Sequence, residues 1–204
     1  MRRRRVLVLL AHPSLERSEV NGELAAQVAS HEHCTLVDLY AEYPSYRIDI
    51  NREQQRLRDH DAVVFLFPLY WYSTPALLKE WLDLVLEHGF AYGAGGTALA
   101  GKYLIAACSA GGPDSAYDPS GMNRFTLRQL LRPLEATAHL CHMRYLPPFS
   151  LFSARTALEE GRIPEHRRSF GQLLDALTHA PLDAWERSES CTVNALVENS
   201  GVAS

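Results

Sequence analysis

The chain lacks the features that mark membrane-spanning, metal-binding and nucleic-acid-binding proteins. No apolar run reaches the roughly 18 residues that a transmembrane helix needs. The 4 cysteines form no CxxC pair and have no histidine at metal-ligand spacing, so we expect no metal site. A formal net charge of -4 over 204 residues offers no basic surface for nucleic acid. Scattered cysteines in apolar runs are typical of free thiols in a reducing compartment, which predicts a cytoplasmic protein.

What the chain does contain is an alternation of apolar runs and helical patterns. The expected strands are 5–11, 35–39, 62–67, 102–109 and 139–145, and the expected helices are 19–30, 51–59, 76–87, 123–137 and 159–178. Asn51 is the expected N-cap of the second helix, and Pro133 is expected to interrupt the fourth. This alternation predicts an α/β fold, a doubly wound five-stranded parallel sheet in the flavodoxin-like order 2-1-3-4-5.

The two ends of the chain differ from the rest. The composition, 47% hydrophobic, suits one domain with a substantial core, which we place at residues 1–180. Residues 181–204 turn small and polar and lose helical periodicity, so we expect a mobile C-terminal tail. The basic start of the chain reads as a solvated segment before the first strand.

The loop after the first expected strand is the first candidate site. It leaves a strand and enters a helix, so its N–H groups and the positive helix end can hold an anion such as a phosphate. It contains neither GxGxxG nor GxxxxGKS, which argues against a Rossmann turn or a P-loop. The alternative is an ordinary turn with a solvated histidine. The candidate anion-binding residues are His12, Ser18, Glu19, Val20 and Asn21.

Two further loops offer surfaces for a flat ring. Aromatic side chains exposed after the third expected strand are costly unless something flat, such as a flavin, packs on them. The alternative is that Trp71 and Tyr72 are core or dimer-contact residues. Paired glycines after the fourth expected strand let the backbone approach a ligand closely, although a plain turn has the same pattern. The candidate ring-binding residues are Leu69, Tyr70, Trp71, Tyr72, Ser109, Ala110, Gly111 and Gly112, and Tyr117 follows on the last loop.

The three loops are expected to meet. They follow strands one, three and four, which are neighbours in a 2-1-3-4-5 sheet whose order switches between strands one and three. Ligands of open α/β sheets bind at such a switch point, outside the carboxyl ends of the strands. The sequence therefore predicts one crevice with a phosphate-binding end and a ring-binding end.

Several of these segments resemble the flavodoxin-like NAD(P)H:quinone oxidoreductase family. The likeness covers roughly residues 5–178 and is nearest to a subgroup, the ancillary subunits of bacterial glutathione-gated potassium efflux systems. The glycine-rich segment and the Trp-containing loop together are its most specific part. The matching segments are Ala11-His12-Pro13 with Asn21, residues 68–75, residues 89–102, and Gly111-Gly112.

The resemblance implies a homodimeric flavoprotein. Flavin phosphate would lie against His12 and residues 18–21, and the ring against residues 69–72 and 109–112. NAD(P)H would deliver a hydride to the flavin and leave, and a quinone would then accept it, which is a ping-pong reaction. The long C-terminal extension of the mammalian enzymes is absent, which favours FMN over FAD.

One position departs from the mammalian pattern, in which a tyrosine and a histidine six residues later stabilise charge on the reduced ring. Tyr117 matches the first, but Asn123 stands at the second place and cannot become a cation. The resemblance therefore implies a catalytic role for Tyr117 only.

Two other functions stay open. The first is a regulatory subunit that docks on a potassium-efflux transporter at the inner face of the membrane, which is compatible with reductase activity. The second is a one-electron flavodoxin carrier. Such carriers are usually more acidic than -4, and the aromatic loop would be unnecessary in one.

Overall fold

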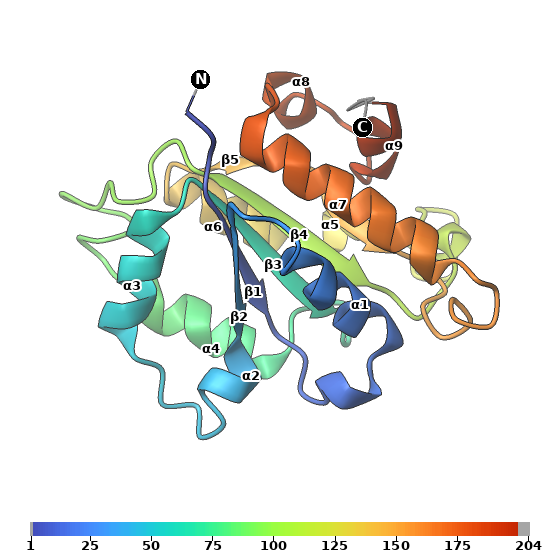
Figure 1. Cartoon of the computed structure of the whole chain (residues 1–204). Helices are drawn as coiled ribbons and strands as arrows, with labels where there is room; N and C mark the ends of the chain where they lie inside the picture. Colours follow the sequence, from blue (N-terminus) through green and yellow to red (C-terminus); the bar gives the residue numbers. More distant parts are fainter. Residues whose placement is uncertain (1, 200–204) are drawn as a thin grey trace.

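The computed structural model describes residues 2–199, and these form a parallel sheet between two layers of helices (Figure 1). The strand order β2-β1-β3-β4-β5 confirms the flavodoxin-like prediction, and a sixth strand, β6, pairs with β4 in parallel. The strands are β1 (Val6–Leu10), β2 (Cys34–Asp38), β3 (Ala62–Pro68), β4 (Tyr103–Ser109), β5 (Arg144–Tyr145) and β6 (Phe149–Leu151).

The central strands are buried on both faces, because their apolar runs leave no polar side to face water. Every residue of β1, β3 and β4 is buried. The helices are α1 (Glu19–Val28), α2 (Leu39–Glu42), α3 (Ile50–Asp59), α4 (Ala76–Val85), α5 (Leu127–Leu130), α6 (Arg132–Leu140), α7 (Ile163–His179), α8 (Asp183–Glu186) and α9 (Asn194–Asn199). None of those in residues 2–199 is long and apolar enough to cross a membrane.

Two hydrophobic clusters, one on each face of the sheet, hold the layers together. Trp81 of α4, Leu57 of α3 and Leu134 of α6 pack in the first cluster. Leu24 of α1 and Leu173 of α7 pack in the second. Figure 1 shows α1 and α7 on one face and α3, α4 and α6 on the other. Helices therefore cover both faces of the sheet, and the loops that follow the strands lie at its carboxyl edge.

The differences from the predicted helices include an N-cap and the start of a helix. The N-cap of α3 is Asp49, whose carboxylate accepts from the Arg52 N–H at 3.1 Å, rather than Asn51. The helix expected over 123–137 starts only at α5, where Thr126 forms a capping box with Gln129. Pro133 then lies in the first turn of a separate helix, α6, where its missing N–H costs nothing.

The fifth strand is also shorter than predicted. Helix α6 continues to Leu140, and only Arg144–Tyr145 of the expected 139–145 strand pairs with β4. Pro147 and Pro148 then interrupt the ladder, because proline has no N–H to donate. Pairing resumes in β6, where Ala107 faces Phe149 and Ser109 faces Leu151. The predicted fifth strand is thus reduced to two residues, and β6 is a sixth strand that was not predicted.

The C-terminal segment holds more structure than its composition indicates. It forms α8 and α9, and Trp185, Val193 and Val197 are buried in the cluster that includes α7. These few apolar side chains anchor a segment in which we expected no helix. The domain boundary at residue 180 stays a prediction, and residues 200–204 of the expected mobile tail lie outside the described residues.

Candidate functional site

The loops after β1, β3 and β4 meet around a cavity of about 280 Å³ at the carboxyl edge of the sheet. Most of the residues expected to bind phosphate or ring therefore lie together, whereas Trp71, Tyr72, Ala110, Gly112 and Tyr117 do not line this cavity. The lining residues are His12, Arg17, Ser18, Glu19, Val20, Asn21, Pro68, Leu69, Tyr70, Ser109, Gly111, Ala154 and Arg155.

His12 stands at the end of β1 as a buried, neutral hydrogen-bond donor. The Ser14 N–H donates to its Nδ1 at 3.1 Å, which leaves the proton of the neutral ring on Nε2. Burial lowers its pKa, although the carboxylates of Glu16 and Asp38 act in the opposite direction. Its ring lies edge-on to that of Tyr70, with centroids 6.3 Å apart. A neutral donor of this kind suits an anionic ligand.

Asn21 joins two of the loops. Its Nδ2 donates to the Ser18 hydroxyl at 3.2 Å and to the Ser109 hydroxyl at 3.0 Å, and Ser18 caps α1 by accepting the Asn21 N–H at 3.1 Å. Asn21 is only 1% exposed, yet its Oδ1 has no partner among the described residues. An orphaned acceptor in a buried position is rare, and a ligand hydroxyl is one group that can satisfy it.

The start of α1 supplies further donors. The N–H groups of Glu19 and Val20 occupy the first turn, where no acceptor exists within the helix. Together with the helix dipole they form a cradle for negative charge. The residues at this end of the cavity therefore fit a phosphate group.

The aromatic loop is a tight turn that points outward. The N–H of Tyr70 donates to the Ser73 carbonyl at 3.1 Å, and the Ser73 N–H donates back at 3.0 Å. Between them Trp71 and Tyr72 adopt φ values of 48° and 63°, as in a type I′ turn. That conformation costs roughly 1–2 kcal/mol per non-glycine residue. Trp71 is 93% exposed, so the alternative that it belongs to the core is wrong.

The glycine loop is held by the chain that follows β6. The Ala110 N–H donates to the Leu151 carbonyl at 2.8 Å, and the Ser153 N–H donates to the Gly112 carbonyl at 2.8 Å. A Cβ at Gly112 would lie 3.4 Å from the ring of Tyr117, so a larger side chain there would press on that ring.

Tyr117 is half-buried, and its ring lies 5.1 Å from that of Phe152. Burial raises its pKa, an effect that Cys108 and Tyr72 increase and a bond from Gly112 opposes. Its hydroxyl is therefore neutral at pH 7 and able to donate. The Tyr72 hydroxyl donates to Asn123 Oδ1 at 3.2 Å, so the residue at the unmatched histidine position tethers the aromatic loop.

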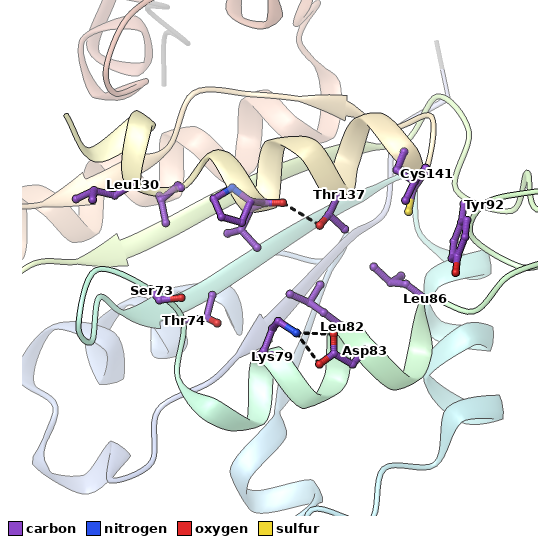
Figure 2. A pocket seen from close by; sticks show the side chains of 14 residues that line it. Ser73, Thr74, Lys79, Leu82, Asp83, Leu86, Tyr92, Leu130, Thr137 and Cys141 are labelled. Carbon is purple, nitrogen blue, oxygen red and sulfur yellow. Dashed lines mark hydrogen bonds and ion pairs between the residues drawn. The ribbon is translucent and has the colours of Figure 1, made fainter. Parts of the chain in front are cut away.

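A second, larger cavity lies away from these loops. It has a volume of about 440 Å³ and forms an apolar groove between α4 and α6 (Figure 2). On the α4 side of the groove, Lys79 Nζ and Asp83 Oδ1 form an ion pair at 2.5 Å. Leu82, Leu86 and Leu130 also line the groove. Ser73 and Thr74 are its only residues from a loop at the carboxyl edge. The groove is therefore a separate feature from the candidate site.

Sequence reasoning missed Arg17 and Arg155. Arg17 ends the short 3-10 turn before α1, next to residues that were singled out. Arg155 comes from a distant part of the chain and reaches the cavity only because β6 pairs with β4. No spacing in the sequence signals that pairing.

Comparison with known proteins agrees with this architecture. A family model described as a flavodoxin-like fold matches residues 4–174, and the chain belongs to this flavodoxin-like family. Among its relatives is the glutathione-regulated potassium-efflux system ancillary protein KefG of Serratia proteamaculans. It is 48% identical over 170 residues, which cover 83% of this chain and 92% of that protein.

Two solved structures are similar over most of their length. General stress protein 14 of Treponema denticola, in complex with FMN, has a TM-score of 0.80 at 38% identity and covers 85% of this chain and 99% of its own. An NADPH-quinone reductase from P. pentosaceus has a TM-score of 0.75 at 32% identity, covering 83% and 96%. The chain thus has the fold of quinone reductases and of an FMN-bound protein.

Proposed function

We propose that this protein is a flavin-dependent NAD(P)H:quinone oxidoreductase that works by a ping-pong mechanism. The observation that carries the proposal is the cavity in which the loops after β1, β3 and β4 meet, with a phosphate cradle built on α1. Support comes from similar structures, one described as FMN-bound and one as an NADPH-quinone reductase.

The residues divide into two groups in this proposal. His12, Ser18, Glu19, Val20 and Asn21 would hold the phosphate and ribityl chain. Leu69 to Tyr72 and Ser109 to Gly112 would hold the ring. The flavin, when bound, accepts a hydride from NAD(P)H and passes it to a quinone. We propose FMN rather than FAD, because the similar structure of general stress protein 14 is described as a complex with FMN.

Tyr117 is the proposed catalytic residue. Its neutral hydroxyl can donate a hydrogen bond to negative charge that develops on a reduced ring. Asn123 holds Tyr72 and does not replace the missing histidine as a cation. Charge stabilisation would therefore depend on Tyr117 and on backbone N–H groups.

The test is the absorbance spectrum of the purified protein before and after NADPH is added without oxygen. We expect flavin bands in the purified protein or after FMN is supplied. NADPH should then bleach these bands. Reoxidation by a quinone should restore the bands. A protein that takes up neither FMN nor FAD would end the proposal, and bands that do not bleach would leave only a carrier or regulatory role.

A regulatory role is a second candidate, favoured by the KefG relatives. The chain would then dock on a potassium-efflux transporter at the inner face of the membrane, from the cytoplasm. Potassium efflux would be measured in cells that carry the transporter, with wild type and with the flavin-site variant Asn21→Leu. Efflux activation that survives the loss of flavin would separate docking from catalysis, and absence of any activation would refute the regulatory role.

We also propose a homodimer in which a second copy covers the groove between α4 and α6. Six of the 14 residues that line the groove are leucines, and one of them, Leu140, is 57% exposed. Leu140→Glu should therefore shift the mass in sedimentation toward a monomer. Leu158→Glu is the matched control, because Leu158 is 55% exposed and lies outside the groove. A monomeric wild type would refute this arrangement.

A further inference from the structure

The C-terminal segment 181–199, which we call the strap, covers one edge of the sheet. Trp185, Val193 and Val197 are buried in the hydrophobic cluster that includes α7, and Figure 1 shows α8 and α9 beside α7. The family model ends at residue 174, so the strap lies outside the part of the chain that this model matches. Any role of the strap is therefore a property of this chain that the family match does not predict.

Asn194 closes the open edge of β6. This strand pairs with β4, and no strand within residues 2–199 lies on its other side, where its backbone groups need other partners. The Ser150 N–H donates to Asn194 Oδ1 at 3.0 Å, and Asn194 Nδ2 donates to the Ser150 carbonyl at 2.9 Å. The Val193 N–H donates to the Pro148 carbonyl at 2.9 Å. One side-chain amide, with its donor and its acceptor, thus takes the place of a neighbouring strand.

The chain that runs through β6 in turn holds the glycine loop. The Leu151 carbonyl accepts the Ala110 N–H at 2.8 Å, and the Ser153 N–H donates to the Gly112 carbonyl at 2.8 Å. Leu151 directly follows Ser150, which the Asn194 amide clamps. A continuous path of hydrogen bonds therefore runs from the strap to both ends of the glycine loop.

Gly111, between the two anchored residues, carries the group that this support positions. It lines the cavity, and its N–H donates to no acceptor within residues 2–199. In the function proposed above, the flavin ring lies against this loop. A free N–H there can donate to a ring that becomes more negative on reduction, and the strength of that bond depends on where the N–H points.

We propose that the strap fixes the glycine loop in the geometry that the flavin ring needs, with Asn194 as its positioning residue. This inference rests on the flavin-dependent function proposed above. Asn194 does not line the cavity and acts through Ser150. Without its amide, the outward N–H and carbonyl of Ser150 lose their partners. Because β6 has only 3 residues, pairing with β4 alone then holds it weakly, and the glycine loop opens more often.

The first experiment follows hydrogen exchange by NMR in the flavin-free protein, so its result does not depend on a cofactor. We expect Asn194→Leu to speed exchange of the Ala110 and Ser153 amides about 10-fold, as the loss of a hydrogen bond would. Asn194→Asp keeps the size of the side chain but has no donor at pH 7, so it should behave like Asn194→Leu. Asn194→Gln keeps both groups and should restore part of the protection.

The matched control is Glu198→Gln, because Glu198 is exposed on the same helix, α9. It should leave the exchange rates of both amides unchanged. Melting curves without flavin show whether each variant is folded. Should Asn194→Leu fail to fold, Asn194→Asp and Asn194→Gln make the same comparison between them.

The second experiment measures the dissociation constants of FMN and riboflavin by fluorescence titration. Asn194→Leu should weaken both about 10-fold and by the same factor, because the strap acts on the ring end and both ligands carry the same ring. The reduction potential of bound FMN should also fall, because the loop N–H favours the more negative, reduced ring. Glu198→Gln should change neither affinity nor potential.

Three results would overturn the inference. Unchanged exchange of Ala110 and Ser153 in Asn194→Leu would show that the strap does not hold the loop. Faster exchange with unchanged flavin affinity and potential would make the Asn194 amide a contributor to stability alone. A loss for FMN that riboflavin does not share would move the effect to the phosphate end. A wild type that binds neither flavin would instead refute the proposed function, and the exchange rates would still decide whether the strap holds the loop.

Discussion

The two ends of the candidate site are built in opposite ways. At the α1 end, the functional groups are buried and bound to one another: Asn21 is 1% exposed and joins Ser18 to Ser109. At the other end, Trp71 is 93% exposed and sits in a turn with positive φ. The first end is organised by the protein itself. The second presents apolar surface and backbone strain that only a bound partner can offset, as is common at binding sites.

The largest effect is expected from breaking the organised end with Asn21→Leu. The change removes the amide that holds two hydroxyl groups and the orphaned Oδ1 acceptor. We expect FMN binding to weaken by about 2–3 kcal/mol, the loss of several hydrogen bonds. Isothermal titration would measure it. Asn51→Leu, on the exposed surface of α3, is the control, and equal losses in both variants would contradict the assignment.

A smaller effect is expected from the exposed end with Trp71→Ala. Loss of an aromatic surface should weaken FMN binding by about 1–2 kcal/mol. Because Trp71 is 93% exposed, the urea midpoint of the flavin-free protein should stay unchanged. Asn21→Leu should lower that midpoint. A Trp71→Ala protein that loses stability but keeps its FMN affinity would show that Trp71 stabilises the fold and does not bind the flavin.

A still smaller change, in the free energy of unfolding, is expected from the backbone strain of the turn at Trp71. Trp71→Gly should be more stable than Trp71→Ala by about 0.5 kcal/mol, because glycine adopts positive φ freely while alanine keeps its Cβ. Both variants lack the indole, so the difference isolates the backbone. Urea unfolding of the flavin-free proteins would measure it, and an alanine variant as stable as the glycine variant would show that the turn is unstrained.

The pH dependence of stability should distinguish the buried end further. Burial lowers the pKa of His12 in the folded state, so the unfolded chain takes up the proton first as the pH falls below about 6.5. The stability that neutral His12 contributes is thus present above that pH and is lost below it. His12→Gln should flatten this slope when urea unfolding is measured across this pH range. Comparing variants cancels the similar contributions of buried His60 and His166.

The central strands of the sheet could be predicted from their sequence pattern. The runs that became β1, β3 and β4 are continuously apolar and short, as is typical of strands that are buried on both faces. Strand order and the position of the three loops follow from topology rules. The last strand was predicted too long and β6 was not predicted, because these two strands have only 2 and 3 residues.

Side-chain contacts could be predicted far less well. Asn21 and Ser109 lie 88 residues apart, and nothing in either segment shows that they share a hydrogen bond. The hydrogen bond from Tyr72 to Asn123 could not be predicted either, because Asn123 lies in a loop where we expected a helix. The outward turn at Trp71 could not be foreseen either, since aromatic residues rarely adopt positive φ.

The proline interruption between β5 and β6 acts as a spacer of fixed length. Leu146, Pro147 and Pro148 separate the two strands, and their number decides which β6 residue faces Ala107. Since side chains alternate along a strand, deletion of one residue here would invert every side chain of the segment that follows. The buried side chains of Phe149 and Leu151 would then point to the opposite face of the sheet. The length of this three-residue segment therefore fixes which residues of the following chain form hydrogen bonds with the glycine loop.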